Sequence, residues 1–156
     1  MKPGKSFKSN DTKRILILCQ NPNDEFEKAL HEFISLNLNS KRQITVLVYK
    51  KKPEENFKSI LTDKEIILTR KSLNIIGLPN KKHLANLFNE SFDIILGLQK
   101  SHNPIFNYII KSIPASFRIG FHFNGSEVIF DIMVKATGNW QKDFRTLQEY
   151  MYQIEK

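Results

Sequence analysis

Two polar segments of related sequence each follow a short apolar run, and both have the residue types to bind an anionic ligand. They are residues 18–22 (LCQNP) and residues 98–104 (LQKSHNP). Asparagine is a good helix cap and proline suits the first helical position, so each segment predicts the start of a helix. Since the N–H groups of a helix start attract anions, we predict one crevice between the two segments. Its expected ligand-binding residues are Gln20, Asn21, Asn23, Gln99, Lys100, Ser101 and His102.

The charges differ between these two helix starts. Asp24 and Glu25 lie in the first turn predicted after Asn21-Pro22, where they compete with any anion. The second start has Lys100 and no early acid, so it is the better anion site. The alternative interpretation is that both Asn-Pro pairs are capping chemistry alone. A third predicted start, residues 80–83 (NKKH), places cations where the helix dipole disfavours them, either by accident or as a phosphate-attracting patch.

Several common chemistries are excluded by what the sequence lacks. No G-x-G-x-x-G segment occurs, which argues against a standard dinucleotide site. Residues 120–126 (GFHFNGS) imitate the glycine spacing of a phosphate-binding loop, but Ser126 stands where the lysine belongs. We therefore expect no resident cofactor.

Metal and thiol chemistry are also disfavoured. The four histidines, at positions 31, 83, 102 and 122, lack zinc-type spacing, and Cys19 is the only cysteine. Cys19 ends an apolar run, so we interpret it as a core residue rather than a nucleophile acting with His102 or His122. No metal site is expected.

The elements that must position the candidate residues follow from the apolar pattern. Residues 92–121 read as strand, polar turn, helix, proline and strand, with Pro114 ending the helix. Residues 14–19, 43–49 and 65–69 predict further strands, and a helix after Asn21 buries Phe26, Ala29, Leu30, Phe33 and either Ile34 or Leu36. Alternating strands and helices predict an α/β fold, a three-layer Rossmann-like sandwich with a mostly parallel central sheet. We expect about five or more strands, with 14–19 and 92–98 as neighbours near the middle.

The other elements are assigned from local signals. Residues 54–61 predict a short helix, residues 72–78 an extended loop, and Asn80 the cap of a helix containing Leu84, Leu87 and Phe88. The Asn-Gly pair at 124–125 predicts a hairpin between residues 118–123 and 127–134 at the sheet edge. Asn139 is expected to cap the last helix, whose apolar stripe begins at Trp140.

Length and charge suggest one domain with a basic arm. The chain has 156 residues and a formal net charge of +8. Residues 1–14 hold five cations against one acid, which makes +4 of that total. We predict a flexible basic arm over residues 1–13 and a single Rossmann-like domain over residues 14–156. Such an arm attracts RNA or ribosomes, or else is a solubilising tail.

The cellular setting follows from what the sequence does not contain. The first fourteen residues are basic and polar, unlike a signal peptide, and no apolar run reaches the length of a membrane span. We therefore expect a cytoplasmic protein with no membrane span.

The central stretch resembles the N-terminal, acceptor-side domain of heptosyltransferase-like (family nine) glycosyltransferases. The resemblance rests on residues 93–99 (DIILGLQ) and residues 115–121 (ASFRIGF), where Arg118 falls one place later than in the family pattern. The whole chain is also similar to a group of small uncharacterised bacterial proteins that contain one Rossmann-like domain.

This resemblance implies a Rossmann-like fold and, by position, makes Asp24 the only counterpart of the family's catalytic aspartate. The family has a Gly-Asp pair there, whereas this chain has Asn23-Asp24. The family also binds its nucleotide-sugar donor in a second domain, which residues 1–156 do not include.

Three hypotheses follow. The leading one is a non-catalytic Rossmann-like binding module that acts through a protein partner, with a small anionic ligand in the crevice. The second is an RNA- or ribosome-associated basic protein. The third is the acceptor-side half of a glycosyltransferase that needs a donor-binding partner.

Overall fold

The described residues form a six-stranded parallel sheet. The computed structural model describes residues 13–20, 23–50, 64–80, 82 and 84–155. Neighbouring strands follow the order β3-β2-β1-β4-β5-β6, the order of doubly wound dinucleotide-binding folds, and every pair is parallel. The strands are β1 Arg14–Gln20, β2 Gln43–Lys50, β3 Lys64–Thr69, β4 Phe92–Gly97, β5 Ala115–Phe121 and β6 Ile132–Val134. The predicted fold class and the central position of β1 beside β4 are confirmed.

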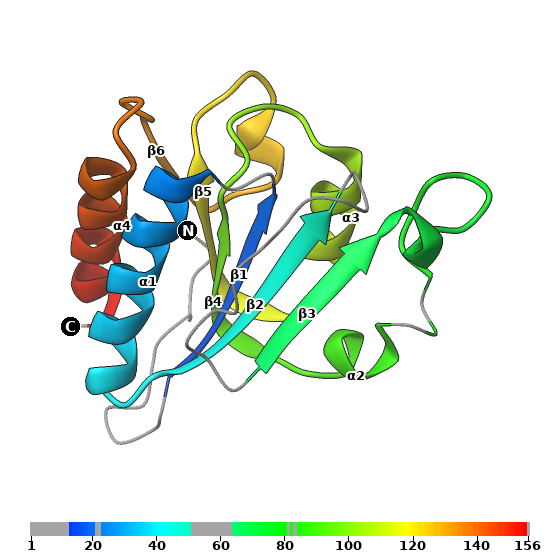
Figure 1. Cartoon of the computed structure of the whole chain (residues 1–156), viewed down its shortest axis with the longest axis horizontal. Coiled ribbons are helices and arrows are strands. Elements are labelled where there is room, and N and C mark those ends of the chain that lie inside the picture. Colours follow the sequence, from blue (N-terminus) through cyan, green and yellow to red (C-terminus); the bar gives the residue numbers. More distant parts are fainter. Residues whose placement is uncertain (1–12, 21–22, 51–63, 81, 83, 156) are drawn as a thin grey trace.

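Helices cover both faces of this sheet, as a three-layer sandwich requires (Figure 1). Helices α1 (Asp24–Asn39) and α4 (Trp140–Glu155) pack on one face. Helix α3 (Pro104–Ser112) and the short α2 (Ala85–Phe88) pack on the other. Two 3-10 turns complete the described elements, η1 Arg70–Ser72 and η2 Ser126–Val128.

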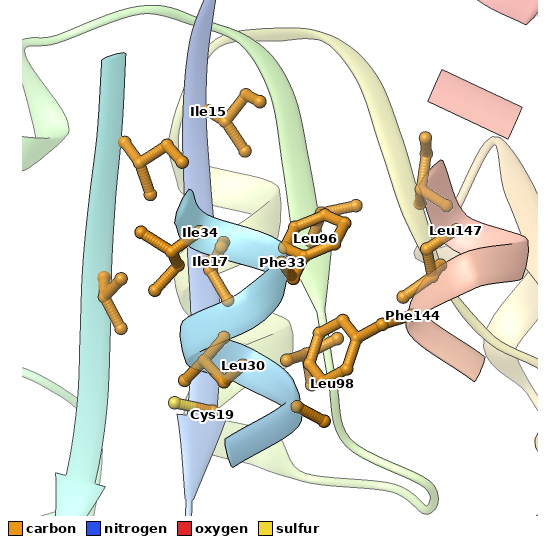
Figure 2. Packing of buried hydrophobic residues seen from close by; sticks show 14 of the residues in the cluster. Ile15, Ile17, Cys19, Leu30, Phe33, Ile34, Leu96, Leu98, Phe144 and Leu147 are labelled. Atoms are coloured by element: carbon orange, nitrogen blue, oxygen red, sulfur yellow. The ribbon is translucent and has the colours of Figure 1, made fainter. Parts of the chain in front are cut away.

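The core explains why the central strands are continuous apolar runs. Ile15, Ile17 and Cys19 of β1 face α1 and α4, whereas Leu16 and Leu18 face α3. Both faces of β1 are therefore buried, and no polar alternation is possible. Figure 2 shows the first of these clusters, with Phe144 and Leu147 of α4 approaching the side chains of α1, β1 and β4. In α1, Ile34 is the buried alternative, and Leu36 is 47% exposed.

A buried amide pair joins α1 to α4. Asn37 Nδ2 donates to Gln148 Oε1 over 2.7 Å and to the carbonyl of Phe33 over 2.8 Å. Asn37 Oδ1 and Gln148 Nε2 are buried and find no acceptor or donor within the described part of the chain. The contact between the two helices thus includes one specific polar bond inside an otherwise apolar layer.

Two glycines make room for an aromatic ring on the other face. Gly97 and Gly120 are paired in the register of β4 and β5. A Cβ at Gly97 would lie 2.8 Å from Cζ of Phe130, and one at Gly120 would overlap the same ring. The buried Phe130 ring therefore lies flat across the two glycines, with Phe123 edge-on to it.

The predicted edge hairpin is wrong. Strand β6 pairs with β5 in parallel, with Ile119 opposite Ile132. After η2 the chain returns along β5, where Asp131 N donates to the carbonyl of Arg118 and Asp131 Oδ2 accepts from Arg118 N. This exchange reverses the chain before β6 begins, and Val128, which lies in η2 and not in the predicted strand, is 70% exposed. The turn at Gly125 (φ 91°) exists, but it leads into η2 rather than into a hairpin strand.

Two helix starts also differ from prediction. Helix α1 is capped by Asn23, whose Oδ1 accepts from Phe26 N over 2.7 Å, and not by Asn21, which lies outside the described residues with Pro22. Asn80 caps no helix: its Oδ1 accepts from Lys82 N, and α2 begins only at Ala85. By contrast, Asn103 and Asn139 cap α3 and α4 as predicted.

Other predictions concern the remaining segments. Residues 72–78 form a closed turn rather than an extended loop, with a bridge between Leu73 and Pro79. Residues 1–12 of the predicted arm over 1–13 and the predicted helix over 54–61 lie outside the described residues. No helix in the described part of the chain is both long enough and apolar enough to cross a bilayer.

Candidate functional site

The two polar segments meet at the carboxyl edge of the sheet. Strands β1 and β4 are hydrogen-bonded neighbours, and Leu98 N still donates to the carbonyl of Leu18 beyond the last ladder pair. Helix α1 leaves on one face of the sheet and α3 on the other, so the two helix starts diverge from this edge. Asn103 Nδ2 donates to Gln20 Oε1 over 3.0 Å, which bridges the two segments directly.

Asn103 also limits what the start of α3 can offer an anion. Its Oδ1 accepts from Phe106 N over 3.1 Å, and Asn107 N donates to the Asn103 carbonyl. Pro104, at the first helical position, has no N–H to give. Among the described residues of this turn, the backbone N–H of Ile105 is the donor that remains for a ligand. Backbone donors alone therefore make this a weaker anion site than its sequence suggests.

A chain of side-chain hydrogen bonds runs outward from Gln99. Gln99 is buried, and its Nε2 donates to Asn107 Oδ1 over 2.8 Å. Asn107 Nδ2 lies 3.0 Å from His102 Nδ1. Because an amide nitrogen only donates, this arrangement assigns His102 Nδ1 as the acceptor and the ring proton to Nε2. The exposed imidazole is thus held in one orientation by two amides behind it.

Asn107 is the one residue of this series of hydrogen bonds that the sequence did not predict. It lies four residues after Asn103, one turn further along α3, on a helix whose other inward residues are apolar. The sequence did contain a signal, a single polar residue four positions after Asn103. An asparagine within a helix is, however, more often an exposed surface residue than part of a site.

Gln99 carries an unsatisfied atom. Its Oε1 is buried without a hydrogen-bond donor among the described residues, and it lies 3.0 Å from where a Cβ on Gly97 would stand. A buried acceptor without a partner costs about 1–3 kcal/mol. The orientation that serves Asn107 and His102 is therefore retained at some expense to stability.

Lys100 is directed elsewhere. Its Nζ lies 4.1 Å from the centroid of the Trp140 ring, at the first position of α4. This cation–π contact places the charge toward the α1 and α4 face of the edge. Ser101 and His102 are exposed beside it.

The other predicted residues lie along the same edge. Asn23 is exposed and uses its side chain to cap α1. Asp24 is exposed at the first position of α1, with Glu25 next to it. Asn21 lies outside the described residues. The structure therefore brings Gln20 and Asn103 together, and Gln99 and His102 through Asn107, while Lys100 faces Trp140.

Cys19 is a core residue, as predicted. Burial raises the pKa of its thiol far above the ordinary value, and the nearby Glu65 carboxylate adds to the shift. The thiolate is therefore absent at neutral pH, which removes Cys19 as a nucleophile. Within the described ranges, no three histidine, cysteine, aspartate or glutamate side chains gather where they could hold a metal ion.

Two charged residues of the transferase-like segments have structural roles. Arg118 Nε and Nη2 donate to the carbonyls of Ile110 and Ile113 over 2.9 and 2.8 Å, which caps the end of α3. Asp93 Oδ2 accepts from Arg14 N over 2.7 Å, at the amino ends of β1 and β4. Neither side chain reaches the carboxyl edge.

Cavities lined by described residues lie away from this edge. One of about 410 Å³ is at the amino ends of the strands, beside Arg14, Arg42 and Lys64. Others of about 360 and 310 Å³ lie between α1 and α4 and between α2 and α3. The candidate site is thus a polar surface edge rather than one of these three hollows.

Comparisons with known proteins give one family and one distant structure. A family model described as "Family of unknown function (DUF6913)" matches residues 2–154. No curated protein sequence matches the chain. The crystal structure of yeast NADH kinase complexed with NADH is similar, with 13% identity and a TM-score of 0.41. The similarity covers 99% of this chain and 42% of that one.

Proposed function

Because the chain belongs to the DUF6913 family of unknown function, we propose its function from the candidate site itself. It is a non-catalytic Rossmann-like binding module that holds a small anionic ligand at the carboxyl edge of its sheet and acts through a protein partner. In this proposal residues 14–156 form the module and residues 1–13 a basic arm.

One observation carries the proposal: the hydrogen bonds from Gln99 through Asn107 to His102. Binding sites gain precision when further hydrogen bonds fix the orientation of the side chain that meets the ligand, and His102 has such support. The assigned Nε2–H of His102 faces outward as a donor for an anionic oxygen. Ser101 adds a hydroxyl on the same turn, while Lys100, whose Nζ lies over Trp140, adds positive charge at the edge without facing His102.

The same geometry favours binding over proton transfer. A catalytic histidine usually has a carboxylate or carbonyl that accepts from its second nitrogen and stabilises the imidazolium. Here an amide N–H faces Nδ1, and an amide gives no such charge stabilisation. Asp24, the candidate base implied by the transferase resemblance, lies on the start of a different helix.

A sugar phosphate is the ligand class that best fits these groups. Its phosphate would meet Ile105 N–H, His102 and Ser101, and its hydroxyls the amides of Gln20 and Asn103. Affinity should be modest, because one backbone N–H remains in this turn of α3 and Asp24 and Glu25 oppose an anion nearby.

A phosphate titration followed by NMR tests the proposal. Inorganic phosphate and glucose 6-phosphate should shift the amide resonances of residues 100–105, the sugar phosphate at lower concentration. His102→Ala and Asn107→Ala should each weaken the response several-fold. His122→Ala is the matched control, since His122 is also exposed but follows β5. If neither compound moves residues 100–105, or if only residues near Lys82 respond, this site does not bind anions.

A second candidate function is RNA or ribosome association, and the charge of the chain favours it. The formal net charge of +8 includes +4 from the five cations and one acid of residues 1–14. Binding through the arm is compatible with an empty or occupied crevice, so the two proposals are tested separately.

A further inference from the structure

A short loop projects from the molecule beyond the end of β3. It follows η1, and in Figure 1 it extends away from the sheet at the far end of the long axis. Its two arms are joined by the bridge between Leu73 and Pro79 and by the hydrogen bond from Asn80 N to the Ser72 carbonyl, 2.8 Å long. The loop is therefore a small closed structure.

The tip of this loop is held by a single asparagine. Asn74 Oδ1 accepts from Ile76 N and Leu78 N, each over 3.1 Å. Asn74 N donates to the carbonyl of Leu78, and Gly77, with φ of 82°, donates back to that of Asn74. The tip conformation is thus fixed before any partner arrives, so little conformational entropy is lost on binding.

Two adjacent isoleucines occupy this tip. Ile75 is fully exposed and Ile76 is 76% exposed. Single exposed apolar residues are ordinary, but turn tips favour small polar residues, and two β-branched apolar ones side by side are unusual there. The fold gains nothing from their side chains, which contribute no packing to either core cluster.

The base of the loop is positively charged. Arg70 and Lys71 precede it and Lys82 follows it, and all three side chains are exposed. The sequence has no aspartate or glutamate between Ile66 and Asn89. An exposed apolar tip with cations and no acids near it in the sequence combines the two attractions that draw a protein to an anionic membrane surface, apolar burial and opposite charge.

We propose that residues 70–80, with Lys82, form a docking tip for an anionic bilayer surface. Ile75 and Ile76 enter the boundary between headgroups and acyl chains, while Arg70, Lys71 and Lys82 meet lipid phosphates. A protein partner fits less well, because a stable interface needs about 800 Å² per side and this tip is a narrow convex projection. The proposal is independent of the ligand site.

Vesicle flotation with the full chain tests this. Vesicles of phosphatidylcholine with about one third phosphatidylserine should carry the protein at physiological salt, and vesicles of phosphatidylcholine alone should carry much less. Ile75→Ser with Ile76→Ser should weaken the apparent partition at least about tenfold, since two apolar side chains no longer enter the bilayer. Val128→Ser is the matched control, because Val128 is 70% exposed on a different loop.

The charges are tested in the same assay. Arg70→Gln with Lys71→Gln should reduce binding to the anionic vesicles at least about fivefold. Lys28→Gln with Lys142→Gln removes the same net charge from exposed sites on α1 and α4, the opposite face of the sheet, and should have a smaller effect. If the isoleucine variant binds the anionic vesicles as well as the wild type does, the proposal is wrong. The membrane affinity would then come from other cations, such as those of residues 1–14. Failure of the wild type to float on the anionic vesicles would also overturn the proposal. If the wild type does not float but retains a bound protein that the isoleucine variant loses, the loop docks a protein and not a membrane.

Discussion

The side-chain amide of Asn103 donates to Gln20 Oε1 over 3.0 Å, although the two residues are 83 positions apart. Gln20 is the last residue of β1, and Asn103 caps the helix that follows β4. The bond therefore closes the edge where the two halves of the sheet meet, and a ligand there would contact both.

Asn103→Asp separates the capping role of this residue from its place in the site. Aspartate still accepts from Phe106 N and suits a helix start, so the free energy of unfolding should stay within about 1 kcal/mol of the wild type or rise. It cannot donate to Gln20, and its charge repels an anion. Phosphate binding by NMR should fall at least about tenfold.

Asn139→Asp is the control for this change, because Asn139 also caps a helix through Oδ1. It should weaken phosphate binding much less than Asn103→Asp does, because its carboxylate lies beside Trp140 and not on the turn that holds His102. An Asn103→Asp variant that binds phosphate like the wild type would place the site away from α3.

Gly120→Ala tests the flat packing of Phe130 on the sheet. The added methyl overlaps the ring, so the variant should lose about 1–3 kcal/mol of stability in urea unfolding. In a Phe130→Leu background the ring atoms are gone, and the same substitution should cost at least about 1 kcal/mol less.

Gly125→Ala is the control for this double-mutant cycle of Gly120→Ala and Phe130→Leu. Gly125 has φ of 91° and open space around it, so alanine there should cost about 1 kcal/mol through backbone strain, with no coupling to Phe130. Additive costs for Gly120→Ala and Phe130→Leu would contradict the packing described above.

The buried thiol of Cys19 should make stability fall at alkaline pH. Its pKa is raised in the folded state, so between the unfolded value of about 8.5 and the higher folded value only the unfolded chain loses the proton. From about pH 7.5 to about pH 9.5 this linkage should lower the free energy of unfolding by about 1.4 kcal/mol.

Cys19→Ala removes that contribution. Its stability is lower throughout because of the cavity, but its decline over the same pH range should be smaller by that amount, since all other groups are shared. The native thiol should also resist aromatic disulfide reagents. Parallel pH profiles for the two proteins would show that Cys19 ionises equally in both states.

Deleting residues 1–12 tests the RNA hypothesis. The deletion should weaken binding to single-stranded RNA and make the dependence of log K on log salt shallower, because fewer counterions are released. Replacing Lys2, Lys5 and Lys8, the cations that the deletion removes, by glutamine in the full chain should reproduce the effect. If RNA titrations of the shortened chain match those of the full chain across salt concentrations, the arm only aids solubility.

The elements that the sequence predicted well are those with local causes. Strands β1 and β4 are buried on both faces, so their residues are apolar without alternation. Asn103 and Asn139 are followed by apolar residues at helical spacing, and both cap helices. These signals lie within a few residues of one another, and tertiary contacts reinforce them.

The failures are cases where distant contacts decide. The Asn-Gly pair before Ser126 is a good hairpin signal, but Phe130 needs the space over Gly97 and Gly120, and Asp131 pairs with the backbone of Arg118. These contacts return the chain to the middle of β5, so β6 is parallel.

For the candidate site, the sequence predicted that the two polar segments meet at one edge of the sheet, but it did not predict the side-chain contacts there. The capping and bridging roles of Asn103, the link through Asn107 and the contact of Lys100 with Trp140 all depend on side-chain directions in three dimensions. The sequence predicted Asn21 as the cap of the first helix, and the structure gives that role to Asn23.

The amide pair between α1 and α4 has a consequence for how the chain finds its native packing. Sliding α4 by one turn along α1 would bring apolar residues against apolar residues again, but it would break the ring contacts of Phe26 with Trp140 and of Phe33 with Phe144. It would also separate Asn37 from Gln148 and leave Gln148 Oε1 without its partner in a buried interface, whereas Asn37 Nδ2 would keep its bond to the Phe33 carbonyl. We therefore expect the amide pair to favour one register of α4 against α1, although its two unsatisfied atoms lower the stability of the fold.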